Sequence, residues 1–153
     1  MEVKGIDELG PWLDHLVALY LDAYQGLGEY AYTRPRDVRH YMRWLFRRAP
    51  HSFFLAVEGK RLLGFIVADS QWLEEGEPVG EIHEIVVAPG AREKGVGKAL
   101  MEKALEHFQQ EGLGEVGLWV GERNLKAQEF YRRLGFRERG KVGHWIRMER
   151  PLP

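Results

Sequence analysis

In residues 92–98, two glycines lie among charged side chains with a spacing that suits the binding of a phosphate group. The segment follows a predicted strand and begins a predicted helix. The first turn of a helix presents unpaired backbone N–H groups and about half a positive charge. Gly95 and Gly97 would let a phosphate oxygen approach this backbone, because glycine has no Cβ. Arg92, Lys94 and Lys98 add positive charge, so the segment is a candidate anion site.

Two common phosphate-binding motifs do not match this segment. A dinucleotide-binding G-x-G-x-x-G motif would need glycine at position 100, where the chain has Leu100. A Walker motif would need Ser or Thr after Lys98, where the chain has Ala99. Taken alone, the segment also fits a plain glycine-rich turn between a strand and a helix.

The composition excludes several other kinds of chemistry. The chain has no cysteine, which excludes disulfides, thiol nucleophiles and metal sites built on thiolates. The three Ser and Thr residues, Thr33, Ser52 and Ser70, lie in no nucleophile-elbow motif. His83 and Glu84 are adjacent, but they do not form the H-E-x-x-H motif, and we expect no metal site.

The elements that must position the glycine segment follow from the spacing of apolar residues. Apolar residues at helical spacing predict helices, and short apolar runs bounded by turn residues predict strands. The predicted helices are 11–24, 35–49, 95–110 and 124–134, and the predicted strands are 52–57, 61–69, 80–88, 115–120, 136–139 and 144–148. An acidic loop is expected over residues 74–78. This order predicts an α/β (α+β) fold, with a mixed, mostly antiparallel sheet and helices on both faces.

Length and charge limit the organisation and the partners of the protein. The chain has 153 residues, with 22 Lys and Arg against 23 Asp and Glu and a formal net charge of −1. This length predicts a single domain over residues 1–153. The balanced charge argues against a nucleic-acid partner. Without a long apolar run or a secretion signal, we expect no membrane partner and a cytoplasmic location.

The order and spacing of the motifs closely resemble those of the GNAT superfamily of N-acetyltransferases. The likeness covers residues 53–149 and rests on the run Ile85 to Pro89, the R-x-x-G-x-G pattern from Arg92, a helix, a strand, and then Asn124, Ala127, Phe130, Tyr131, Leu134, Gly135 and Phe136. The resemblance implies that the central strands, matching 81–88 and 115–120, splay apart. It also implies acetyl-CoA (coenzyme A) as the cofactor, bound in the gap between them.

The same resemblance implies which residues bind acetyl-CoA. The backbone of the first splayed strand would hold the pantetheine arm, and amides of the glycine segment would cradle the pyrophosphate. Asn124 would contact the arm or order its turn, and Tyr131 would lie near the sulfur. The implied cofactor-binding residues are Ile85, Val86, Val87, Arg92, Glu93, Lys94, Gly95, Val96, Gly97, Lys98, Asn124 and Tyr131.

Acetyl transfer to an amine needs a base, because an alkylamine with a pKa of about 10.4 is protonated near neutral pH. Glu84, which directly precedes the Ile85–Val87 run, is the first candidate, and Glu81 is the second; His83 could relay the proton. Strict alternation places Glu84 on the opposite face of the strand from Glu81 and His83, unless a bulge intervenes. By resemblance, Tyr131 would donate a proton to the departing thiolate.

The acceptor is expected only as a class, the primary amine of a small molecule, a peptide or a protein. Its pocket could be walled by aromatic residues, and nearby acidic residues could attract a cationic amine; these are Tyr24, Tyr30, Tyr32 and Trp72, with Glu74, Glu75 and Glu77. A catalytically silent acetyl-CoA-binding module and an α/β domain without a cofactor are the alternatives to an enzyme. The sequence leaves a homodimer open.

Overall fold

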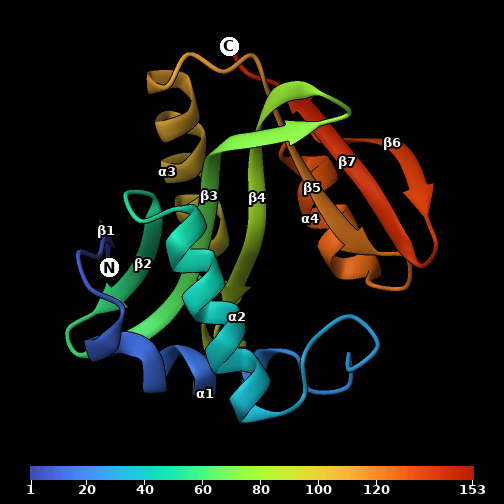
Figure 1. Ribbon diagram of the computed structural model, residues 1–153. Coiled ribbons are helices and arrows are strands. Elements are labelled where there is room, and N and C mark those ends of the chain that lie inside the picture. The colour runs from blue at the N-terminus through green and yellow to red at the C-terminus, as the bar shows by residue number, and fades with distance from the viewer.

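A seven-stranded sheet with helices on both faces forms the framework of the computed structural model, which describes residues 1–153 (Figure 1). The strands are β1 Glu2–Gly5, β2 Phe53–Glu58, β3 Arg61–Glu74, β4 Glu77–Val87, β5 Glu115–Gly121, β6 Arg137–Val142 and β7 Trp145–Pro151. The α-helices are α1 Leu13–Ala23, α2 Pro35–Arg48, α3 Val96–Gln110 and α4 Leu125–Arg133, with short 3-10 helices η1 Gly10–Trp12 and η2 Pro89–Ala91. The predicted α/β class is confirmed.

The sheet has the order β1-β2-β3-β4-β5-β7-β6. Neighbouring strands are antiparallel everywhere except at β4 and β5, which run parallel. Parallel neighbours need a crossover connection, and here α3 supplies it. The strand that ends at Val87 therefore leads through residues 88–95 directly into α3.

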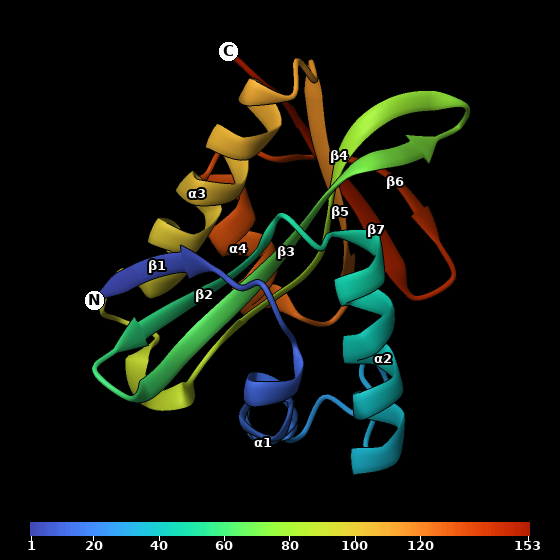
Figure 2. The ribbon, with the colours of Figure 1, turned by 60° about the vertical axis from the view of Figure 1, so that its left-hand side comes forward.

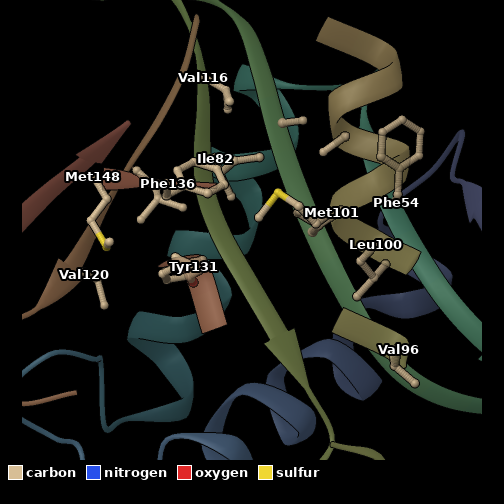
Figure 3. Close-up of a cluster of buried hydrophobic side chains, with 14 of the residues drawn as sticks. Phe54, Ile82, Val96, Leu100, Met101, Val116, Val120, Tyr131, Phe136 and Met148 are labelled. Atoms are coloured by element: carbon tan, nitrogen blue, oxygen red, sulfur yellow. The ribbon is translucent and has the colours of Figure 1, made fainter. Parts of the chain in front are cut away.

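Alternating side chains of the strands build one hydrophobic core on each face of the sheet. In β2, Phe53 and Leu55 pack on the side of α1 and α2, whereas Phe54 and Ala56 pack on the side of α3 and α4. Figure 3 shows part of the core on the side of α3 and α4, to which Tyr131 of α4 also belongs. The buried stripe of α3 that covers this core consists of Val96, Leu100, Met101, Ala104 and Phe108. The sheet thus holds the starts of α3 and α4 at fixed positions beside β4 and β5.

The structure adds one strand that the sequence did not predict and lengthens several of the predicted ones. Residues 2–5 form the edge strand β1, which pairs with β2 in a register of Glu2 with Val57 and which the sequence pattern did not predict. Its four residues are too few for a clear alternation of apolar and polar side chains. The expected acidic loop 74–78 is wrong, because β3 runs to Glu74 and β4 begins at Glu77. Glu75 and Gly76 form a two-residue hairpin turn with positive φ angles of 51° and 84°.

No helix of the structure is long and apolar enough to cross a membrane. The four α-helices have 11, 14, 15 and 9 residues, and each has a polar outer side. They serve to cover the sheet and to frame the space between its central strands.

Candidate active site

A cavity of about 1390 Å³ lies where β4 and β5 separate. These strands pair at only two positions, Gly80 with Val116 and Glu81 with Gly117. Beyond Glu81 the two strands diverge, as Figure 1 shows. The cavity is lined by residues of both strands, the segment between α1 and α2, the start of α3, and α4. The expected splay of the central strands is confirmed.

The glycine segment contributes to the wall of this cavity and leaves backbone donors free. Gly95 directly precedes α3 with a φ of 76°, in the left-handed region that favours glycine. The N–H of Lys94 donates to the carbonyl of Ala91, and the N–H of Ala99 donates to the carbonyl of Gly95. Between them, the N–H groups of residues 95–98 donate to no carbonyl of the chain. Such free amides at a helix start fit a phosphate group.

Glu84 lies inside the cavity between the side chains of two tyrosines. The hydroxyl of Tyr41 donates to Oε1 of Glu84 at 2.7 Å, and the hydroxyl of Tyr24 donates to Oε2. Burial raises the pKa of Glu84 to about 7, although the two hydrogen bonds favour the carboxylate and act in the opposite direction. A carboxyl with this pKa can accept and release a proton near neutral pH.

A β-bulge in β4 explains why Glu84 points towards α1 and α2. In the pairing with β3, Val67 lies opposite Glu84 and Ala68 lies opposite Ile82, which leaves His83 as an extra residue. The bulge interrupts the alternation of the strand, so His83 and Glu84 both face the α1 and α2 side. Strict alternation would have placed Glu84 on the face of the strand opposite to His83, and this bulge is the irregularity that brings the two side chains to the same face.

Tyr131 is buried in the cavity wall at 9% exposure. Burial, and then the negative charge of Glu84, hold the pKa of the Tyr131 phenol well above its usual range. The phenol is therefore protonated at neutral pH and can act as a donor. Its position in α4 follows from the cap that begins this helix, where Oδ1 of Asn124 accepts the N–H of Ala127 at 3.4 Å. Asn124 thus orders the turn, which was one of its two expected roles.

Glu81, the second candidate base, is held in an ion pair. Its Oε2 lies 2.7 Å from Nη1 of Arg147, and the two side chains are 3% and 5% exposed. Arg147 also lies 3.0 Å from Oε2 of Glu149 and 3.6 Å from Oε2 of Glu74. To reach Glu81 from β7, the guanidinium crosses Gly117 of β5, where a Cβ would lie 2.1 Å from Nη2. This contact joins the strands at the closed end of the cleft.

The cavity brings together most of the predicted cofactor-binding residues. Those that line it are Ile85, Val86, Val87, Arg92, Glu93, Gly95, Gly97, Lys98, Asn124 and Tyr131. Lys94 and Val96 do not line it, since Lys94 points into solvent and Val96 is buried in the core at 1% exposure. Any contact from these two positions would come from their backbone. The Arg92 guanidinium donates to the carbonyl of Ala23 at 3.0 Å, which links the glycine segment to α1.

The aromatic residues expected around the acceptor are partly in place. Tyr24, Tyr30 and Tyr32 line the cavity, but Trp72 does not. Trp72 lies outside it against His83, with ring centroids 4.7 Å apart. The expected acidic attraction is not supported, because Glu74, Glu75 and Glu77 belong to the β3–β4 hairpin and none lines the cavity.

Two groups of site residues did not emerge from the sequence as partners. One is the pair of tyrosines on Glu84, because the sequence suggests Tyr24 only as part of the pocket wall and gives no sign of a contact from Tyr41. The other lies beside the cavity, where Asp69 Oδ2 is 2.8 Å from Nε2 of His83 and 2.7 Å from Nε of Arg48. The only signal for the second group was the presence of a histidine and an aspartate on neighbouring strands.

Comparison with known proteins agrees with this geometry. The model of the acetyltransferase (GNAT) family matches residues 13–136. An uncharacterized N-acetyltransferase of Methanocaldococcus jannaschii is 41% identical to this chain over 138 residues. The match covers 89% of this chain but 61% of the relative, so this chain spans less than two thirds of the relative's length. A crystal structure from Pyrococcus horikoshii OT3 has a TM-score of 0.91 at 34% identity, covering 99% of this chain and 98% of that chain. The paiA N-acetyltransferase from Thermoplasma acidophilum, in complex with coenzyme A, shares the fold with a TM-score of 0.81 at 21% identity and 99% coverage of both chains. The chain belongs to the GNAT acetyltransferase family.

Proposed function

We propose that this protein transfers an acetyl group from acetyl-CoA to a primary amine by direct attack of the amine. Glu84 is the general base, and Tyr131 is the proton donor to the departing thiolate. One observation carries the proposal: a carboxyl group with a pKa of about 7 faces the cavity between the splayed strands. A base with this pKa is largely ionised just above neutral pH and still accepts a proton readily.

Different parts of the cavity wall would bind different parts of the cofactor. The free amides of residues 95–98 suit the diphosphate of the cofactor, and Lys98 and Arg92 add positive charge beside them. The diverging backbone of β4 at residues 85–87 offers hydrogen-bonding groups to the pantetheine arm. When bound, acetyl-CoA supplies an acetyl thioester that an amine can attack.

Glu84 and Tyr131 then handle the two proton movements of the reaction. Glu84 accepts the proton that the amine must lose, and Tyr24 and Tyr41 stabilise its carboxylate by hydrogen bonds. A backbone N–H of β4 is suited to stabilise negative charge on the carbonyl oxygen. Tyr131 gives its proton to the sulfur as the thiolate leaves, and the phenol is restored from solvent.

The release of free CoA from acetyl-CoA in the presence of a panel of primary amines tests this function. We expect CoA release that depends on the amine and saturates with it. Glu84→Gln should lower turnover by about 10²-fold or more while the calorimetric affinity for CoA stays within about twofold. Binding of acetyl-CoA without amine-dependent release would instead identify a silent binding module, and the absence of binding would contradict the cofactor assignment.

A further inference from the structure

The outer side of α2 carries a row of basic residues, Arg36, His40, Arg43 and Arg47. They follow one another at steps of four, three and four residues, which places them on one side of the helix. All four are exposed. We call these four residues the basic stripe. Figure 2 shows α2 at the outside of the molecule.

The basic stripe differs from the other arginines of α2 in having few acidic partners. Arg39 pairs with Asp14 at 2.6 Å, and Arg48 pairs with Asp69 at 2.7 Å. In the stripe, the only ion pair is between Arg36 and its neighbour Asp37, with Nε and Oδ1 3.8 Å apart. Arg43 and Arg47 have none. In a chain of net charge −1, this concentration of unpaired positive charge is a surface that attracts anions.

The basic stripe adjoins a hollow that shares two tyrosines, Tyr32 and Tyr41, with the main cavity. This hollow has a volume of about 480 Å³ and is lined by Tyr32, Asp37, His40, Tyr41 and Trp44. His40 belongs to both the stripe and the hollow. Tyr41 belongs to both the hollow and the main cavity, and its hydroxyl contacts Glu84. A chain molecule could therefore extend from the stripe, across the aromatic hollow, to the carboxylate that receives the proton.

We propose that the acceptor is a polypeptide with an acidic segment that follows the acetylated amine and binds along the basic stripe. This inference rests on the proposed function, since it concerns the acceptor of the same site. At 1.5 Å per residue, the stripe is about 16 Å long, which matches about five residues of extended chain. The first residues of the acceptor would occupy the hollow, and carboxylates further along would meet Arg43 and Arg47.

An acidic polypeptide explains the stripe better than a nucleic acid does. The stripe adjoins a hollow that shares Tyr32 and Tyr41 with the cavity of Glu84, and the proposed reaction there needs a primary aliphatic amine, which a polypeptide has and a nucleic acid lacks. The three arginines of the stripe outnumber the single carboxylate of the hollow, Asp37, which already faces Arg36. The net charge next to the amine site is therefore positive and complements carboxylates.

Binding of three labelled peptides tests this inference without relying on catalysis. Each peptide has a free N-terminus, the same three small residues, and then five glutamates, five glutamines or five lysines. By fluorescence anisotropy at low salt, we expect the glutamate peptide to bind about tenfold more tightly than the glutamine peptide, and the lysine peptide to bind most weakly. The difference should shrink as the salt concentration rises, because exposed charges are screened.

Charge reversal locates the effect on the surface. The double variant Arg43→Glu with Arg47→Glu should abolish the preference for glutamate. Arg137→Glu with Arg139→Glu on β6 makes the same change in net charge at two exposed arginines elsewhere and should leave the preference intact. A control peptide consists of the three small residues alone, with an amidated C-terminus and no charged tail. Its rate of acetylation should be equal in the two double variants, because none of the four substituted arginines lines the cavity.

The outcomes separate this inference from the proposed function. If the glutamate preference depends on Arg43 and Arg47 but no acceptor is acetylated, the proposed function fails and the surface assignment stands. Equal binding of the three peptides, or a preference that survives reversal at Arg43 and Arg47, overturns the inference. Tighter binding of a single-stranded oligonucleotide of equal charge, or of phosphatidylserine vesicles, also overturns it.

Discussion

The hydroxyl of Tyr41 donates a 2.7 Å hydrogen bond to Oε1 of Glu84, although the two residues are 43 positions apart in the chain. The contact joins α2 to the bulged part of β4 and fixes the carboxylate inside the cavity. Because the hydrogen bond favours the charged form, it lowers a pKa that burial has raised. Tyr41 is thus placed to tune the pKa of the base.

Tyr41→Phe should move the acidic limb of the pH–rate profile to higher pH. Loss of one hydrogen bond to the carboxylate raises the pKa of Glu84, so a higher pH is needed to ionise it. A hydrogen bond to a charged group is worth roughly 1.5 kcal/mol or more, which corresponds to a shift of about one pH unit. The profile of kcat/KM against pH measures the shift. Tyr32→Phe is the control, because the hydroxyl of Tyr32 makes no contact with Glu84, and an equal shift in both variants would contradict this account.

Glu84→Gln should stabilise the folded protein at alkaline pH while it reduces activity. The pKa of Glu84 is about 7 in the folded protein, against an ordinary value of 4.5 for a glutamate, so between these two pH values the folded state holds a proton that the unfolded state has lost. The stability that Glu84 contributes therefore falls as pH rises through this window, by at most about 3 kcal/mol. Urea unfolding at pH 5 and pH 8 measures the effect. A glutamine that stabilises equally at both pH values would show that the ionisation of Glu84 is not the cause.

Tyr131→Phe should lower turnover by about 10²-fold with little change in the affinity for CoA. The substitution removes only the hydroxyl, and the ring still packs against Phe136, with centroids 5.9 Å apart. General acid catalysis by a positioned side chain is typically worth 10²-fold or more. Steady-state kinetics and calorimetry of CoA binding separate the two quantities. Equal losses of turnover and affinity would assign Tyr131 a structural role.

The main features of the fold could be predicted from the sequence because their signals are local. The amphipathic stripe of α3 and the glycine at position 95 mark a helix and its start within one segment. The contact between Tyr41 and Glu84 could not be predicted, since it depends on how α2 docks against a bulged strand. The same holds for Arg147, whose position over Gly117 requires the register of β5 with β7. Local patterns predict elements, whereas the pairing of distant side chains depends on packing.

Gly97→Val should abolish detectable CoA binding, and Gly97→Ala should weaken it by about tenfold. A Cβ at Gly97 would lie 3.0 Å from Cζ of Phe130 and 3.6 Å from Cγ2 of Val87, so the substitution crowds α4. We expect a second effect as well, because a side chain at this position hinders the close approach of a phosphate oxygen to the free amides. Phe130→Leu relieves the first effect only. We expect Gly97→Ala with Phe130→Leu to recover thermal stability but not CoA affinity. Recovery of both would show that the glycine is needed only for packing.

Glu81→Gln should retain most of the activity, in contrast to Glu84→Gln. The Oε2 atom of Glu81 lies 2.7 Å from Nη1 of Arg147 in a buried ion pair, so this carboxylate is less available to an amine than that of Glu84.

Removing Arg147 instead leaves the charge of Glu81 buried and unpaired, which typically costs about 3–5 kcal/mol. Arg147→Met should therefore destabilise the protein strongly, and Glu81→Gln added to it should restore much of the stability. A double-mutant cycle by urea unfolding, with kcat measured for the four proteins, tests both statements. A fall in kcat for Glu81→Gln as large as that for Glu84→Gln, with an unchanged free energy of unfolding, would assign the role of base to Glu81.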